Sequence, residues 1–237
     1  PTITTSTLST DRVDRKVIQF GYSGETVKKN TNYCWKRCRC TVGKEPDAQV
    51  FAEEHLLLAT LNSSEAKTKG WELYYFDESG FSLHPVVPYA WQPKGQTIRI
   101  PSTASPRLNV LGFFSKTQPA FFQQTETTVN SQTVIAAFNA FVKQQNDEKI
   151  WRIVVMDNAP IHHSRAFQDC IKEWMLKRVW IHYLPAYCPE LNLIEILWRR
   201  IKHQWLPLTS YANFRTLRKN ISYILQNIGK KYKLTFA

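Results

Sequence analysis

Three acidic residues stand at positions where a folded α/β protein could bring them together. Asp77 follows the apolar run WELYYF (71–76), and Asp157 follows the apolar run WRIVVM (151–156). Ligands of α/β sheets gather beyond the carboxyl ends of strands, so chemistry is expected at both positions. Aspartate also ends strands because it favours turns, and for either residue alone this structural role is the favoured interpretation.

The third acid, Glu195, lies on a helix predicted over about 192–205. Apolar residues recur there every three or four positions and predict a buried stripe: Leu191, Ile194, Trp198, Ile201 and Trp205. Glu195 borders this stripe, so we expect it to face inward, where a carboxylate must be paired, hydrogen-bonded or metal-bound. Two structural alternatives are a capping box with Asn192 and an ion pair with Arg199 one turn later.

Short apolar runs predict the strands that carry these residues. The run 71–76 is expected to pair back with 81–84 across a turn at 78–80. Further strands are predicted at 107–114, 119–124, 151–156 and 179–184. The last two are apolar enough to be buried on both faces.

Helical spacing of apolar residues predicts five helices. They cover 47–66, 131–146 with Ser131 as its cap, about 164–177, about 192–205 and about 211–229. Three antiparallel strands come first, followed by helix, strand, helix, strand and helix. This order predicts an α/β fold with a mixed sheet, in which βαβ crossovers follow the antiparallel part.

The composition indicates a folded protein with an anionic partner. The hydrophobic fraction is 43%, and the net charge is +12, which favours nucleic acid over a membrane surface. No run approaches the roughly 18 apolar residues that span a bilayer, and the first thirty residues lack a signal-peptide core, so we expect an intracellular protein. Cys34, Cys38 and Cys40 lack a partner pair at finger-like spacing, which argues against zinc.

Basic residues are concentrated in three parts of the chain. Residues 1–46 are predicted to be a basic N-terminal segment, and 47–237 the main domain with a Pro-rich insertion near 85–106. The residues concerned are Lys36, Arg37 and Arg39, then Trp91, Lys94 and Arg99, and finally Arg199, Arg200 and Lys202. Each group fits a solvated face or contact with DNA phosphates, and the overall charge favours phosphate. For the insertion, packing against a second subunit is the alternative.

Three segments carry a resemblance to a known family. YYFDESGF (74–81), VVMDNAPIHHS (154–164) and LPAYCPELNLIEILWRRIK (184–202) resemble the signature blocks of the Tc/mariner superfamily of DDE transposases, and look most like its bacterial insertion-sequence branch. AWQPKGQ (90–96) is similar to a further block of these enzymes. The chain departs from the pattern at Leu193, where the family usually has a proline that presets the first helical turn.

The resemblance implies a ribonuclease-H-like fold and a role for each acid. Asp77, Asp157 and Glu195 would be the catalytic ligands of Mg²⁺ or Mn²⁺, as two ions, and carboxylate oxygens are the ligands these hard cations prefer. Asn158 and His163 would be neighbours of the active site, with His163 favoured over His162. Strand alternation points Glu78 to the opposite face, which predicts a structural role.

The resemblance also implies an activity and partners. The expected activity is cut-and-paste DNA transposition, with strand cleavage at transposon ends and strand transfer into double-stranded target DNA. The resemblance also suggests TA dinucleotides as target sites, although the sequence does not fix the target preference. A homodimer associated with DNA in the cytoplasm is expected if the source is prokaryotic, with residues 1–46 as the remnant of a helix-turn-helix region. The alternatives are a ribonuclease-H-like nuclease that does not join DNA and a catalytically silent DNA-binding remnant; the three intact acids argue against the remnant.

Overall fold

The computed structural model describes residues 47–63, 70–84, 106–145 and 149–235. The predictions for Lys36, Arg37, Arg39, Trp91, Lys94 and Arg99 lie outside these residues, as do those for the three clustered cysteines. The division into a basic N-terminal segment and a main domain with an insertion therefore stays a prediction.

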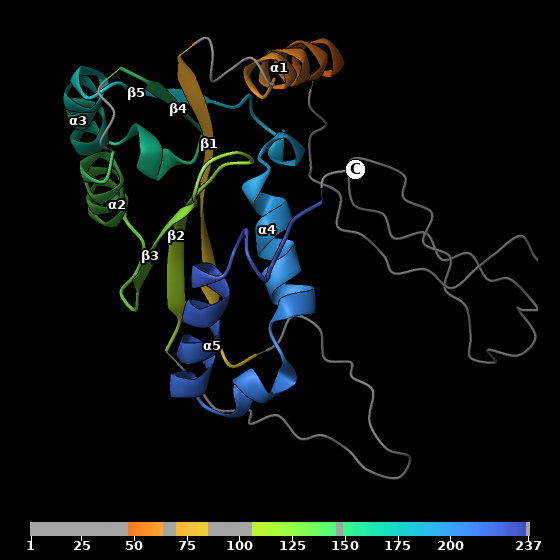
Figure 1. Ribbon diagram of the computed structural model, residues 1–237. Helices are drawn as coiled ribbons and strands as arrows, with labels where there is room; N and C mark the ends of the chain where they lie inside the picture. Colours follow the sequence, from red (N-terminus) through yellow and green to blue (C-terminus); the bar gives the residue numbers. More distant parts are fainter. Residues whose placement is uncertain (1–46, 64–69, 85–105, 146–148, 236–237) are drawn as a thin grey trace, which may run out of the picture. The chain divides into compact units, whose positions relative to one another are not determined.

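A mixed sheet of five strands lies at the centre of the described structure (Figure 1). Its order is β3-β2-β1-β4-β5, from β1 (Trp71–Phe81), β2 (Leu108–Phe114), β3 (Phe121–Thr125), β4 (Trp151–Met156) and β5 (Val179–Tyr183). β1, β2 and β3 pair antiparallel, whereas β1 with β4 and β4 with β5 pair parallel. The predicted mixed sheet, antiparallel first and parallel afterwards, is confirmed.

Helices cover both faces of this sheet. They are α1 (Ala48–Leu61), α2 (Ser131–Lys143), α3 (Arg165–Leu176), α4 (Ile194–Arg200) and α5 (Phe214–Gln226), and α4 continues as a π-helix over Ile201–Trp205. Figure 1 shows α2 and α3 on one face and α4 and α5 on the other. Among the described helices, none has both the length and the apolar character needed to cross a membrane.

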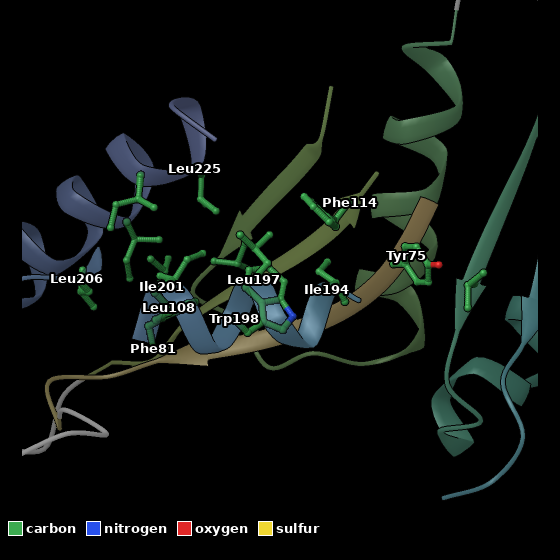
Figure 2. Close-up of a cluster of buried hydrophobic side chains, with 14 of the residues drawn as sticks. Tyr75, Phe81, Leu108, Phe114, Ile194, Leu197, Trp198, Ile201, Leu206 and Leu225 are labelled. Carbon is green, nitrogen blue, oxygen red and sulfur yellow. The ribbon is translucent and has the colours of Figure 1, made fainter. Parts of the chain in front are cut away.

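Alternation along β1 supplies one apolar cluster on each face of the sheet. Tyr74 and Phe76 pack with buried side chains of α2 and α3. Leu73 and Tyr75 belong to the cluster on the other face, which also holds Phe81 and the buried side of α4 (Figure 2). The next residue on this second face is Asp77, so the fold directs an acid toward α4.

Two strand predictions were wrong. β1 does not turn back at 78–80; it runs on to Phe81, because β2 pairs with all of its second half from Tyr75 onward. Asp77 therefore lies inside the strand, opposite Gly112, and does not end it. β5 is an edge strand, so Trp180 is 49% exposed and the strand is not buried on both faces as expected.

One helix prediction also needs correction. Asn130 caps α2, since its side chain accepts a hydrogen bond from Thr133 N. The Ser131 hydroxyl, the predicted cap, instead donates to the Ile161 carbonyl at 3.0 Å. The predicted helix α1 does form, and Leu58 is its one buried residue. Helices at the other predicted places are confirmed, within a few residues at their ends.

Candidate active site

The parallel register of β1 and β4 brings two of the acids to the same level. Tyr75 pairs with Val155, and two residues further each strand reaches its aspartate, Asp77 or Asp157. Neighbouring strands lie roughly 4.8 Å apart, so the two aspartates stand side by side at one end of the parallel pairing. This end faces the loop that follows β5 and the start of α4.

A pocket of about 260 Å³ opens at this end of the sheet. Asp77, Asp157 and Glu195 all line it, together with Asn158, Ala159, Asn192 and the loop 184–189. Glu195 is exposed, whereas the sequence predicted that it faces inward. The reason is its place at the first turn of α4, where Ile194 and Trp198 occupy the buried side of the helix.

Neither structural alternative for Glu195 forms. The helix starts without a side-chain cap, and the Asn192 amide donates instead to the Phe76 carbonyl at 3.0 Å. Glu195 and Arg199 form no ion pair, although both are described. Asn192 Oδ1 is buried with no hydrogen-bond partner among the described residues, and Asn192 lines the pocket. The sequence analysis treated Asn192 only as a cap; its place beside the buried stripe, three residues before Glu195, was the available signal.

Asp77 is the most enclosed of the three acids. Trp198 Nε1 donates to its Oδ2 at 3.1 Å. Burial, followed by the negative charges of Glu195 and Glu78, raises the pKa of Asp77 from 3.8 to about 8. The carboxyl is therefore largely protonated at neutral pH, and a nearby cation would favour its ionised form.

Asp157 has the opposite environment. Its Oδ1 accepts from Ala159 N at 3.1 Å and lies 2.9 Å from Nδ1 of His162. The hydrogen bond from His162 lowers the pKa of Asp157, and the Ala159 amide adds to this against the opposing effect of burial. Two neighbouring aspartates with pKa values displaced in opposite directions are typical of active sites.

His162 joins Asp157 to an acid on the other face of β1. The imidazole is 1% exposed, and its Nε2 lies 3.1 Å from Oε1 of Glu78. Burial lowers the pKa of His162, but the hydrogen bonds to Asp157 and Glu78 outweigh it and raise the pKa to about 9. Glu78 does point away from Asp77, as alternation predicted, but it contacts the histidine that holds Asp157.

The sequence analysis favoured His163 over His162, and the structure places His162 next to the acid. His163 is exposed, stacks on Tyr183 with ring centroids 4.6 Å apart, and lies 3.0 Å from Asn158 Oδ1 through Nε2. Asn158 in turn donates to the Leu184 carbonyl. Asn158 and His163 thus stabilise the loops at the pocket, and neither contacts a carboxylate.

One of the three predicted basic residues beyond Glu195 interacts electrostatically with the acids. Lys202 is half-buried with Nζ 5.4 Å from the Phe81 ring centroid. Burial lowers the pKa of Lys202, while the charges of Glu195 and Asp77 act in the opposite direction. Arg199 is exposed, and Arg200 donates to the Gln204 side chain at 2.6 Å.

The lining residues fit a hard divalent cation in their chemistry. Three carboxylates line one pocket, and the pKa of Asp77 is raised partly by the charges of the other acids, a repulsion that a cation would reverse. Among the residues that the structure describes, however, no three His, Cys, Asp or Glu side chains lie close enough together to hold a metal ion. The three acids share a pocket but do not converge on one point.

Comparison with solved structures shows the fold. The Mos1 mariner paired-end complex with Mn is similar with a TM-score of 0.51 and 18% identity, over 83% of this chain and 60% of that chain. The Mos1 catalytic domain has a TM-score of 0.48 and 16% identity, over 78% of this chain and 85% of that domain. The predicted ribonuclease-H-like fold is confirmed. The chain spans about 60% of the length of the Mos1 paired-end complex chains.

Comparison with families identifies the chain. No curated protein sequence matches it. The family described as DDE superfamily endonuclease matches residues 72–218, which is more than half of the chain and includes all three acids. The predicted Tc/mariner-type resemblance is confirmed at this level, and its bacterial branch stays a prediction. The chain is a member of the DDE superfamily endonuclease family.

Proposed function

We propose that this chain is the catalytic part of a cut-and-paste DNA transposase. It cleaves DNA strands at the ends of its element and joins them to target DNA. The observation that supports the proposal is that Asp77, Asp157 and Glu195, from three distant segments, line one pocket. Family membership supports the same chemistry, since the match spans these segments.

In this proposal the three carboxylates hold Mg²⁺ or Mn²⁺, as a pair of ions. When bound, such ions activate the attacking oxygen and stabilise the leaving oxygen of a phosphodiester. The chain itself positions the acids. Ala159 and His162 both contact Oδ1 of Asp157, which leaves its second oxygen without a bond to either. Lys202, which interacts electrostatically with Glu195 and Asp77, would attract a DNA phosphate toward the acids.

The proposed partners are the transposon ends and the double-stranded target. The similar Mos1 structure is a paired-end complex, and a homodimer here would likewise hold two ends. Arg199 and Arg200 would contact the backbone beside the pocket, and Asn158 and His163 would brace its wall. The basic groups outside the described residues would extend the contact with the DNA backbone. Residues 1–46 would be the remnant of a helix-turn-helix region. The protein would be bound to DNA in the cytoplasm.

Nicking of supercoiled plasmid DNA by the full chain with Mg²⁺ tests the metal site. Glu195→Gln should reduce nicking by about a thousandfold, because loss of a metal-ion contribution of several kcal/mol corresponds to that factor. The matched control is Glu190→Gln, the same change five residues earlier on an exposed residue that does not line the pocket. Equal activity of Glu195→Gln and wild type would refute the proposal.

An assay for the joining of DNA strands distinguishes a transposase from a nuclease that only cleaves. A labelled duplex of the element's terminal sequence with a free 3′-hydroxyl is incubated with plasmid, Mg²⁺ and the full chain. We expect label to enter the plasmid with wild type and not with Asp157→Ala. Nicking without joined product would favour a nuclease that only cleaves. Neither activity, with DNA binding retained, would favour a silent DNA-binding remnant.

A further inference from the structure

A buried indole links two of the three acids. Trp198 lies on α4 three residues after Glu195, is 2% exposed, and donates from Nε1 to Oδ2 of Asp77 on β1. We propose that Trp198 is a positioning residue of the active site: its N–H fixes one oxygen of Asp77 and ties the helix that carries Glu195 to the strand that carries Asp77. This inference rests on the proposed function.

Packing holds the ring of Trp198 in place. Its ring lies edge-on to Phe81 and Phe122, with centroids 6.4 and 6.1 Å away. Gly112, which pairs with Asp77 on the adjacent strand β2, leaves room for the ring. A Cβ at this position would come within 2.9 Å of the Trp198 ring and of Ile194. Figure 2 shows Trp198 among the apolar side chains of this cluster. The N–H therefore reaches Asp77 from a side chain that has no room to turn away.

The chemistry of indole suits this role. Its nitrogen only donates, does not titrate near neutral pH and does not bind metal, so it cannot compete with the carboxylates for a cation. By holding Oδ2, it restricts the rotation of the Asp77 carboxyl and leaves the second oxygen without a contact to the indole. Groups that orient metal ligands in this way typically contribute about 10–100-fold to metal affinity or activity.

The matched control is another buried tryptophan. Trp174 on α3 is also 2% exposed and donates from Nε1, at 2.8 Å, to Asn139. It lies in the cluster on the opposite face of the sheet, away from the acids. Trp174→Phe therefore removes the same ring atoms and a similar buried hydrogen bond as Trp198→Phe, without a carboxylate at the other end.

The experiment measures binding of Mn²⁺ to the full chain, without DNA, by electron paramagnetic resonance of the free ion. We expect Trp198→Phe to weaken Mn²⁺ binding about tenfold or more and Trp174→Phe to change it less than about twofold. Thermal unfolding in EDTA establishes that both variants are folded. If Trp198→Phe does not fold, the benzothiophene analogue of tryptophan at position 198 removes only the N–H and keeps the ring shape.

The outcomes distinguish this inference from the proposed function. Undiminished Mn²⁺ binding by the variant at position 198, while Asp77→Asn abolishes it, would overturn the role of Trp198 alone. Equal weakening by Trp174→Phe would also overturn it, because the loss would then reflect general loosening of the core. Failure of the wild type to bind Mn²⁺, or equal binding by Asp77→Asn, would refute the proposed metal site itself.

Discussion

Removing the charge of Asp77 should stabilise the protein while abolishing its chemistry. The pKa of this carboxyl is raised from 3.8 to about 8, first by burial and then by the charges of Glu195 and Glu78. The folded state therefore keeps a proton that the unfolded chain releases, and wild-type stability falls as pH rises from about 4 to about 8. Asn does not titrate, so Asp77→Asn should escape this loss.

The size of the effect follows from the pKa. One pKa unit corresponds to about 1.4 kcal/mol, so the displacement from 3.8 to about 8 costs the folded protein at most about 6 kcal/mol above pH 8. The asparagine oxygen can still accept from Trp198, but its NH₂ must find partners of its own, at a cost of about 1–3 kcal/mol. We therefore expect Asp77→Asn to be more stable than wild type by about 3–5 kcal/mol above pH 8, and less stable by about 1–3 kcal/mol near pH 4.

Urea unfolding in EDTA at pH values from 4 to 9, followed by tryptophan fluorescence, measures this difference. The control is Asp169→Asn, which removes a charge from an exposed position on α3 that does not line the pocket. The stability gain of Asp77→Asn should grow up to about pH 8 and then level off. A gain that does not depend on pH, or a loss of stability at pH 8, would refute the electrostatic reasoning.

Three further substitutions test other parts of the site and its support. His162→Phe should destabilise the protein by about 3 kcal/mol at pH 6. This loss of stability should shrink as pH rises through about 9, because wild-type His162 then loses its proton. Urea unfolding that shows the same loss at every pH would contradict this. Gly112→Ala should lower the free energy of unfolding by about 1–3 kcal/mol and slow plasmid nicking, because the added Cβ displaces Ile194 and Trp198. Unchanged unfolding and nicking would show that the neighbouring side chains can move to accommodate the Cβ. Asn213→Ala should cost about 1 kcal/mol by removing the cap of α5, with nicking intact, and lost nicking in a folded variant would link α5 to the site.

The periodicity of apolar residues predicted the fold well, because each apolar run can bury its side chains in only one kind of element, a helix or a strand. WRIVVM became β4 with the predicted ends, and the stripe through Ile194, Trp198 and Ile201 is buried as expected. The strand ends of β1 could not be predicted in the same way. The polar run Asp-Glu-Ser-Gly reads as a turn, yet pairing with β2 keeps it extended, and that pairing partner lies thirty residues away in the chain.

The site was predictable in its acids but not in the groups that hold them. Resemblance to a family pointed to Asp77, Asp157 and Glu195, and all three line the pocket. The contact of His162 with both Asp157 and Glu78 depends on a short 3₁₀-helix at Pro160–His163 that turns one histidine inward and leaves the next outside. The bond from Trp198 to Asp77 likewise depends on how closely α4 approaches the sheet at Gly112.

Electrostatic repulsion between ionised carboxylates favours a separation of the three acids. Two unit charges 4 Å apart repel by about 4 kcal/mol at the effective dielectric of a protein surface. Glu195 already raises the pKa of Asp77 from an exposed position, and a closer approach would add to that repulsion. A divalent cation between them changes the sign of the interaction. The contacts that hold the three acids differ accordingly. Asp77 is held by β1 and by Trp198, and Asp157 by the end of β4 and by His162. Glu195 lies in the first turn of a short helix that has no side-chain cap. The acid with the fewest restraints is thus the one whose position a cation would have to change.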